Sequence, residues 1–159
     1  MQFQRDSDRI TVLVADDDTQ IRNLAQAILS RDGYFTLIAC DGQQALEASR
    51  DHSGPIHLLL SDVQMPRLNG PELCEQIRQE RHEIICVLMS GNVSAASKAE
   101  EMSFIKKPFT PDALRCKLRE LLQRRGRQDS AESPKRPTHV ESRASEQHER
   151  SAKYAWGSG

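Results

Sequence analysis

Four apolar runs in the chain each end in polar side chains that together could hold a phosphoryl group and a divalent cation. The runs are residues 12–15, 58–60, 87–89 and 104–105, and the polar residues that follow them are Asp16, Asp17, Asp62, Ser90 and Lys107. If the runs are neighbouring parallel strands, their carboxyl ends meet at one edge of one sheet, where open α/β sheets bind ligands. The ordered set therefore predicts a single site.

The chemistry open to these residues is phosphoryl transfer to a carboxylate. An aspartate can attack phosphorus to give an aspartyl phosphate. Because both reactants are negatively charged, a bridging cation and an ammonium group would stabilise the transition state. In this interpretation Asp62 is the nucleophile, Asp16 and Asp17 hold Mg²⁺, which takes only one or two protein carboxylates, and Lys107 supplies the ammonium. The Ser90 hydroxyl could then donate to the phosphoryl group and draw its loop inward.

The elements that must position these side chains follow a repeating pattern. Up to about residue 123, short apolar runs alternate with amphipathic stretches, as in repeated βα units around a parallel sheet. The predicted strands are 10–15, 34–39, 56–61, 84–89 and 103–106. Asp18 is expected to cap the first helix, and a turn is expected at Asp41 and Gly42. Gly70 and Pro71 begin the third helix, a short fourth spans 94–102, and Thr110 and Pro111 open the last.

Composition indicates one globular domain followed by a polar tail. We predict a flexible segment over 1–9, a domain over 10–123, and a disordered tail over 124–159, since the tail has few large apolar groups to offset its ordering entropy. The net charge of −1 divides into an acidic front with 14 basic and 18 acidic residues and a tail with 8 and 5. This balance argues against bulk attraction to nucleic acid, so no direct DNA binding is expected.

The sequence also lacks signals for a membrane or a secreted location. No run reaches the roughly 18 apolar residues of a membrane span, and the first residues lack the apolar stretch of a secretory signal. We therefore expect a cytoplasmic protein without membrane association. Cys40, Cys74, Cys86 and Cys116 are scattered, which favours inert thiols over a zinc or redox site.

The residues around Asp62 resemble those of a known signalling family. Residues 61–66, read as Ser-Asp-Val-Gln-Met-Pro, are followed by Asn69 and Gly70. This segment resembles the phosphoacceptor region of the receiver domain of two-component response regulators, and the resemblance covers roughly residues 10–123. It implies a doubly wound, flavodoxin-like (βα)5 fold with a parallel sheet of strand order 2-1-3-4-5, here a stand-alone receiver with a disordered tail.

The resemblance also implies a role for each residue of the site. Asp62 is the phosphorylated residue, Ser90 the switch hydroxyl, and Lys107 the lysine that precedes a cis peptide bond to a proline. The implied metal ligands are Asp16, Asp17, Asp62 and the backbone carbonyl of Gln64. Phe104 matches an aromatic switch position, and Gln64 and Asn92 match positions that tune the lifetime of the phosphoryl group.

Partners and output are implied in the same way. The phosphoryl group would come from a histidine on a sensor kinase or a phosphotransfer protein, and the chain would not be a turnover enzyme. Phosphorylation would change the face built from the fourth helix, the fifth strand and the last helix, exposing a surface for an unknown downstream protein or for a homodimer. Only 16 residues separate Ser90 from Lys107, so the short fourth helix departs from the family pattern.

Two other interpretations remain open from the sequence. In a haloacid-dehalogenase-like phosphatase, Asp16 would be the nucleophile and Asp18 a second acid, but Gln20 stands where a threonine is expected and the chain is short for the remaining motifs. A receiver-like scaffold that is not phosphorylated would keep the fold without the switch. The intact set of acids, hydroxyl and lysine argues against it.

Overall fold

The central feature of the molecule is a parallel sheet of five strands in the order β2-β1-β3-β4-β5. The computed structural model describes residues 9–92 and 102–131, with side chains up to residue 127. The strands are β1 (Thr11–Ala15), β2 (Phe35–Ala39), β3 (Leu58–Asp62), β4 (Ile85–Ser90) and β5 (Ser103–Lys106). The predicted fold class and strand order are confirmed.

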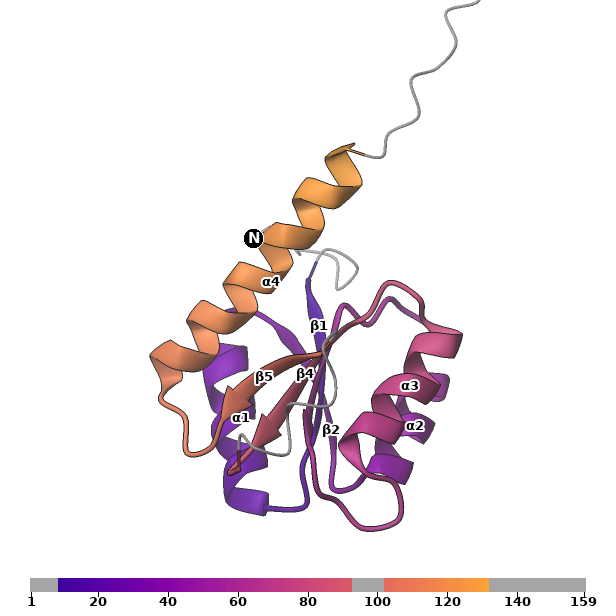
Figure 1. The fold of residues 1–159 in the computed structure, drawn as a ribbon, viewed down its shortest axis with the longest axis vertical. Coiled ribbons are helices and arrows are strands. Elements are labelled where there is room, and N and C mark those ends of the chain that lie inside the picture. Colours follow the sequence, from indigo (N-terminus) through magenta and orange to yellow (C-terminus); the bar gives the residue numbers. More distant parts are fainter. Residues whose placement is uncertain (1–8, 93–101, 132–159) are drawn as a thin grey trace, which may run out of the picture.

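Four described helices cover the two faces of the sheet. They are α1 (Thr19–Arg31), α2 (Gly42–Asp51), α3 (Gly70–Glu80) and α4 (Pro111–Ala131). Helices α1 and α4 lie on one face and α2 and α3 on the other (Figure 1). The predicted helix over 94–102 falls almost wholly outside the described residues, so the label α4 belongs to the predicted last helix.

Burial on both faces explains the continuous apolar runs of the central strands. In β1, Val12 and Val14 pack toward α1 and α4, whereas Leu13 and Ala15 pack toward α2 and α3, and all four side chains are fully buried. A strand that is covered on both sides has no polar alternation. This leaves the carboxyl ends of the strands as the place where polar side chains reach solvent.

Local signals start the helices where the sequence predicts them. Asp18 caps α1, accepting from the backbone N–H of Gln20 at 2.8 Å. Asn69 and Glu72 form a capping box at the start of α3, each side chain bonding to the backbone of the other. The predicted turn at Asp41 and Gly42 is instead the N-cap and first residue of α2.

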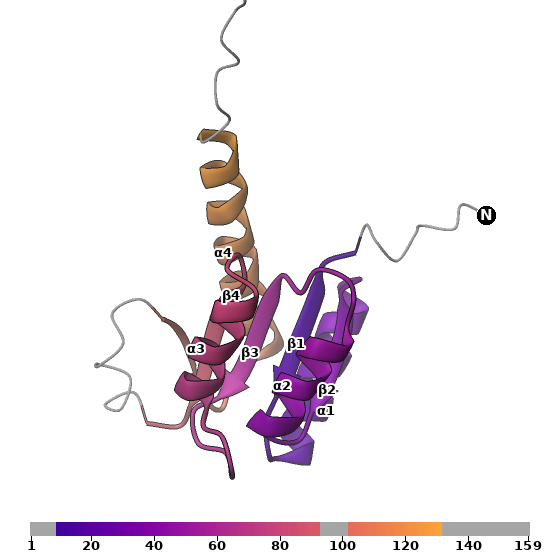
Figure 2. The same ribbon diagram turned by 90° about the vertical axis from the view of Figure 1, so that its right-hand side faces the viewer.

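The predicted boundary of the domain at residue 123 is wrong for the last helix. Helix α4 continues to Ala131, so residues 124–131 are helical and do not belong to a disordered tail. This part projects past the sheet (Figures 1 and 2). Ion pairs of Arg124 with Glu120 at 2.7 Å and of Arg125 with Glu83 at 2.7 Å support it.

Residues 1–8 and 132–159 lie outside the described residues. Within the described part, no helix has the length and apolar character to cross a bilayer.

One arginine joins the ends of two helices. Arg81 follows α3, and its guanidinium lies at the carboxyl end of α2, where it donates to the backbone carbonyls of Ser49 at 2.7 Å, His52 at 2.6 Å and Gly54 at 2.9 Å. It also donates to the buried Ser49 hydroxyl at 3.1 Å. A cation at a helix carboxyl end satisfies carbonyls that have no partner inside the helix.

Replacing Arg81 should therefore destabilise the fold. We expect Arg81→Ala to lower the free energy of unfolding by about 2–3 kcal/mol, because it removes several charge-assisted hydrogen bonds at once. Urea denaturation measures this. The matched control is Arg31→Ala, an exposed arginine in the last turn of α1, which should cost no more than about 0.5 kcal/mol. Equal effects of the two variants would contradict this account of Arg81.

A half-buried histidine ties the starts of β1 and β3 together. The Nδ1 atom of His57 accepts from the backbone N–H of Thr11 at 3.0 Å, so this nitrogen carries no proton in the fold. Burial lowers the pKa of His57, and the positive charge of Arg125 lowers it further. His57 lines a surface cavity together with Arg81, His82 and Glu83.

This histidine predicts a loss of stability in acid. The pKa of His57 in the folded state lies below its ordinary value of 6.5. Neutral His57 therefore contributes its full share to the stability of the fold above pH 6.5, and this share is lost as the pH falls below 6.5 and through the folded pKa. Unfolding free energies at about pH 7.5 and about pH 5.5 should show this loss, and His57→Asn, whose Oδ1 can still accept from Thr11, should reduce it. The exposed His82→Asn is the control. An unchanged loss in His57→Asn would show that His57 is not its source.

Candidate functional site

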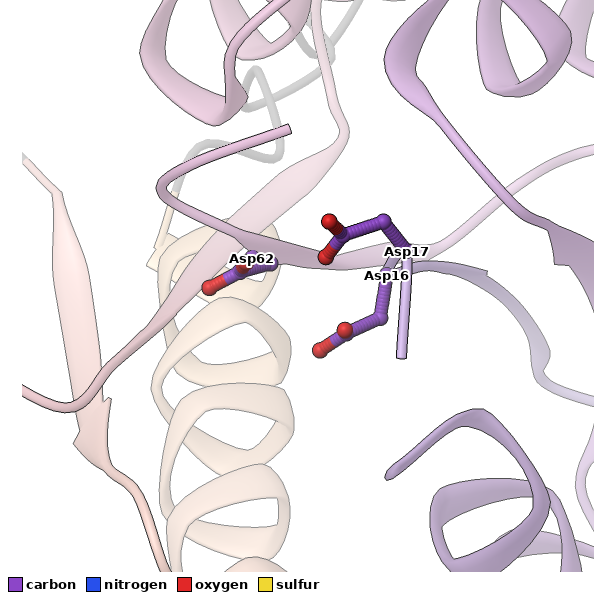
Figure 3. A group of neighbouring side chains, drawn as sticks. All are labelled: Asp16, Asp17 and Asp62. Atoms are coloured by element: carbon purple, nitrogen blue, oxygen red, sulfur yellow. The ribbon is translucent and has the colours of Figure 1, made fainter. Parts of the chain in front are cut away.

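Three carboxyl groups meet at the carboxyl edge of the sheet. Asp16 and Asp17 follow β1, Asp62 ends β3, and these two strands are neighbours with Ala15 opposite Ser61. Each of the three residues offers a carboxylate oxygen within 4.8 Å of the others, and Figure 3 shows the three side chains as close neighbours. Asp16 is fully buried, Asp62 is half-buried and Asp17 is exposed. The cluster is thus anchored in the core and open on one side.

An ammonium group lies against this cluster. The Nζ atom of Lys107 is 2.6 Å from Asp16 Oδ2 and 3.1 Å from Asp62 Oδ1. The backbone N–H of Lys107 donates to the carbonyl of Ser90 at 2.8 Å, and the peptide bond to Pro108 is cis, as the resemblance implies. One ammonium facing three carboxylates leaves an excess of negative charge at this edge.

The environment shifts the pKa values of both Asp62 and Lys107 upward. Burial raises the pKa of Asp62, the hydrogen bond and charge of Lys107 lower it, and the charges of Asp16 and Asp17 raise it again, so that the net shift is upward. Burial lowers the pKa of Lys107, but its close contacts with the negatively charged Asp16 and Asp62 outweigh this and raise it. Lys107 is therefore an ammonium at neutral pH, and the carboxyl groups repel one another.

The contacts of Asp16 fit a cation at the cluster. Its Oδ1 atom accepts from the backbone N–H of Asp18 at 2.9 Å. Its Oδ2 atom is buried and, among the described residues, has no donor with hydrogen-bond geometry; the ammonium of Lys107 at 2.6 Å is a close charge contact outside that geometry. Hard divalent cations bind carboxylate and carbonyl oxygens. The acidic cluster is thus compatible with metal binding.

Beside the cluster lies a cavity of about 380 Å³, and most of the predicted site residues line it. Those residues are Asp62, Gln64, Ser90, Asn92 and Lys107. The Ser90 hydroxyl donates to the backbone carbonyl of Asn92 at 2.9 Å and accepts from its N–H at 3.1 Å. In this structure the Ser90 hydroxyl therefore already makes two hydrogen bonds to the backbone of its own loop.

A second cavity, of about 560 Å³, is lined mainly by the loop between β3 and α3 and by the start of α3. Asp17 and Gln64 line it, so Gln64 borders both cavities. Phe104, the predicted aromatic switch, lines neither; it is half-buried and packs against the core between the sheet, α2 and α3. The structure therefore brings together all predicted site residues except Phe104.

Two further residues help to shape the site, and of these Arg22 was not singled out from the sequence. Arg22 in α1 donates to the backbone carbonyl of Asp16 at 2.7 Å and to the Thr19 hydroxyl at 2.8 Å, which fixes the turn after β1. At Gly70, a Cβ atom would lie 2.2 Å from the carbonyl oxygen of Asp62, so only glycine fits. The arginine gives no sequence signal, because one basic residue on a helix is ordinary. Gly70 was predicted as a helix start and as part of the segment that resembles the phosphoacceptor region, but its close approach to Asp62 was not predicted.

Comparison with known proteins identifies the family. The family model described as the response regulator receiver domain matches residues 12–119. The chain belongs to this family. It is similar to response regulator RR06 of Streptococcus pneumoniae, with 34% identity over 120 residues that cover 72% of this chain and 54% of that protein. It is also similar to response regulator MprA of Mycobacterium leprae, with 34% identity over 128 residues, 77% of this chain and 55% of that protein.

Solved structures agree with the sequence relatives. The crystal structure of a CheY-like receiver domain protein from Methanospirillum hungatei has a TM-score of 0.67 and 26% identity, covering 76% of this chain and 98% of that one. The protein is thus a two-component receiver domain with the acidic pocket typical of Mg²⁺ and phosphoryl-aspartate sites. The chain spans about half the length of the curated relatives it matches.

Mutual repulsion in the acidic cluster predicts that removing one charge stabilises the fold. We expect Asp17→Asn to raise the free energy of unfolding by about 1 kcal/mol in the presence of a chelator, since unit charges a few ångströms apart at a wet surface repel by roughly this amount. Thermal and urea denaturation measure it.

Two comparisons make this test specific. The exposed Glu75→Gln in α3 removes a charge elsewhere and should change stability by no more than about 0.5 kcal/mol. Added MgCl₂ should stabilise the wild type more than Asp17→Asn, because binding to the folded state adds to its stability. A loss of stability in Asp17→Asn without metal would contradict the repulsion.

Proposed function

We propose that the chain accepts a phosphoryl group on Asp62 from a histidine of a sensor kinase or a phosphotransfer protein. A carboxylate oxygen of Asp62 forms the new O–P bond as the P–N bond of the donor histidine breaks, and the departing imidazole nitrogen keeps the electron pair. The observation that carries the proposal is the position of Lys107, whose ammonium contacts Asp16 and Asp62 at once inside a cluster of carboxylates. The chain acts as a phosphoacceptor and not as a turnover enzyme, and it works in the cytoplasm.

The same residues would hold Mg²⁺. We assign its ligands to the carboxylates of Asp16, Asp17 and Asp62 and to the backbone carbonyl of Gln64. When bound, the ion neutralises charge on the phosphoryl oxygens. The Lys107 ammonium stabilises the opposite side of the group as charge develops there. The buried Oδ2 atom of Asp16 and the excess of negative charge support this assignment.

The Ser90 hydroxyl and the Phe104 ring would carry the signal. A phosphoryl group adds strong acceptor oxygens, so the Ser90 hydroxyl would leave Asn92 and donate to it instead. Phe104 would then adjust its packing, and the surface around β5 and α4 would change its affinity for a downstream protein or a second copy of the chain. Gln64 and Asn92, which line the cavity next to Asp62, would set how readily water reaches the phosphoryl group.

Labelling with small phosphoryl donors tests the proposal. With MgCl₂, acetyl phosphate and phosphoramidate, whose P–N bond resembles that of phosphohistidine, should each add one phosphoryl group to the wild type, as measured by intact-protein mass. Asp62→Asn should gain none, because the nearly isosteric amide is not a nucleophile. A chelator should abolish the labelling of the wild type.

The controls separate this function from its alternatives. Glu75→Gln should be labelled like the wild type. Labelling of Asp62→Asn at an unchanged rate would move the phosphoacceptor elsewhere. A wild type that takes up no phosphoryl group from either donor would make the chain a non-phosphorylated interaction scaffold.

A further inference from the structure

The loop between β3 and α3, residues 63–69, contains a strained turn. Arg67 is the non-glycine residue with positive φ in the described part of the chain, at +71°. The backbone N–H of Leu68 donates to the carbonyl of Pro66 at 2.9 Å, which closes a γ-turn around Arg67. A γ-turn with positive central φ is the rarer and more strained form. Such a conformation persists only where the surroundings impose it.

Contacts with the start of α2 impose this conformation. The guanidinium of Arg67 pairs with the carboxylate of Asp41, the N-cap residue of α2. Asp41 is 1% exposed, and its other carboxylate oxygen accepts from the backbone N–H of Gln44 at 2.9 Å. Breaking the pair would leave a buried carboxylate without its cation, which is costly. The arginine is thus held at its tip although most of its side chain is exposed.

The backbone of the loop lies directly on the same helix. A Cβ atom on Gly42 would come within 2.1 Å of the carbonyl oxygen of Leu68, so this approach requires glycine. The Leu68 side chain is buried in the core beneath α2 and α3. At its base, the loop is closed by the bond from the N–H of Gly70 to the carbonyl of Val63 at 3.0 Å. The loop is therefore fixed at its base and at its tip.

Between these two fixed points lies Gln64, which borders both cavities of the site. Arg67 and Asp41 line neither cavity. We infer that the Arg67–Asp41 ion pair positions the 63–69 loop, and with it the Gln64 carbonyl, for metal binding at the Asp16, Asp17 and Asp62 cluster. This inference rests on the proposed function of that cluster. Arg67 and Asp41 are positioning residues and do not touch the reacting atoms.

The test uses substitutions that remove the pair without removing the cap or adding strain. Asp41→Asn keeps an N-cap residue, since asparagine caps helices as well as aspartate does. Arg67→Gly removes the cation and also relieves the positive φ. Arg67→Lys restores a cation. The control is Arg50→Gln, which breaks the ion pair of α2 with Glu80 at 2.6 Å, away from the loop.

Calorimetric titration with MgCl₂ is the first measurement. We expect Asp41→Asn and Arg67→Gly to weaken Mg²⁺ binding by about tenfold, the usual size of effect when the support of a ligand is removed. Arg67→Lys should recover most of the affinity, and Arg50→Gln should match the wild type. Arg67→Gly should lower the melting temperature only modestly, because the relief of the positive φ offsets part of the cost of leaving the Asp41 carboxylate unpaired. Unchanged Mg²⁺ affinity in Asp41→Asn and Arg67→Gly, or an equal loss in Arg50→Gln, would overturn the inference.

Labelling by acetyl phosphate provides the second measurement. In Arg67→Gly the Mg²⁺ concentration that gives half the maximal rate should rise about tenfold, whereas the rate at saturating Mg²⁺ should stay near that of the wild type. A general disruption of the fold would lower the maximal rate instead, and that outcome would overturn the inference. A wild type that neither binds Mg²⁺ nor takes up phosphate would refute the proposed function itself, which separates the two failures.

Discussion

The fold holds three mutually repelling carboxylates, those of Asp16, Asp17 and Asp62, close together. Three carboxyl groups gather at the sheet edge, one ammonium pairs with two of them, and the most buried, Asp16, is fully removed from solvent. The excess negative charge is repulsive when no metal ion is bound. The cluster persists because β1 and β3 pair in register and are covered on both faces. Asp16 and Asp62, at the ends of these strands, therefore cannot move apart without disrupting the core. The buried sheet is what makes a destabilising site possible.

Rigid and adaptable parts of the site lie on different kinds of structure. Asp16, Asp62 and Lys107 stand at strand ends, where backbone pairing fixes their positions. Asn92 lies in the loop that follows β4, whereas the loop that carries Gln64 is held against α2. Groups that must meet a reacting atom need a fixed geometry, whereas a signal requires something that can move. The strand ends and the loop after β4 separate the two requirements within one cavity.

The sequence predicted what depends on local pattern and missed what depends on distant partners. The doubly covered strands and the Asp18 cap could be predicted because burial and capping leave short-range signals. The helical state of 124–131 could not, since it is supported by Arg125 pairing with Glu83, 42 positions away. The ion pair of Arg67 with Asp41 has the same character. Nothing in the local sequence around an arginine in a polar loop indicates that it pairs with a buried carboxylate.

In the proposed function, the strength of the switch would depend on the hydrogen bonds that Ser90 makes before phosphorylation. Its hydroxyl already donates to and accepts from the backbone of Asn92, so moving to a phosphoryl group exchanges hydrogen bonds and does not simply add one. The net gain is the difference between a charge-assisted bond and a neutral one, together with the cost of any backbone group left unpaired. A difference of that size shifts a population between two states and does not lock one of them. In the proposed function, the loop after β4 would therefore set the balance between the two states, while the aspartates and Lys107 would carry out the phosphoryl transfer.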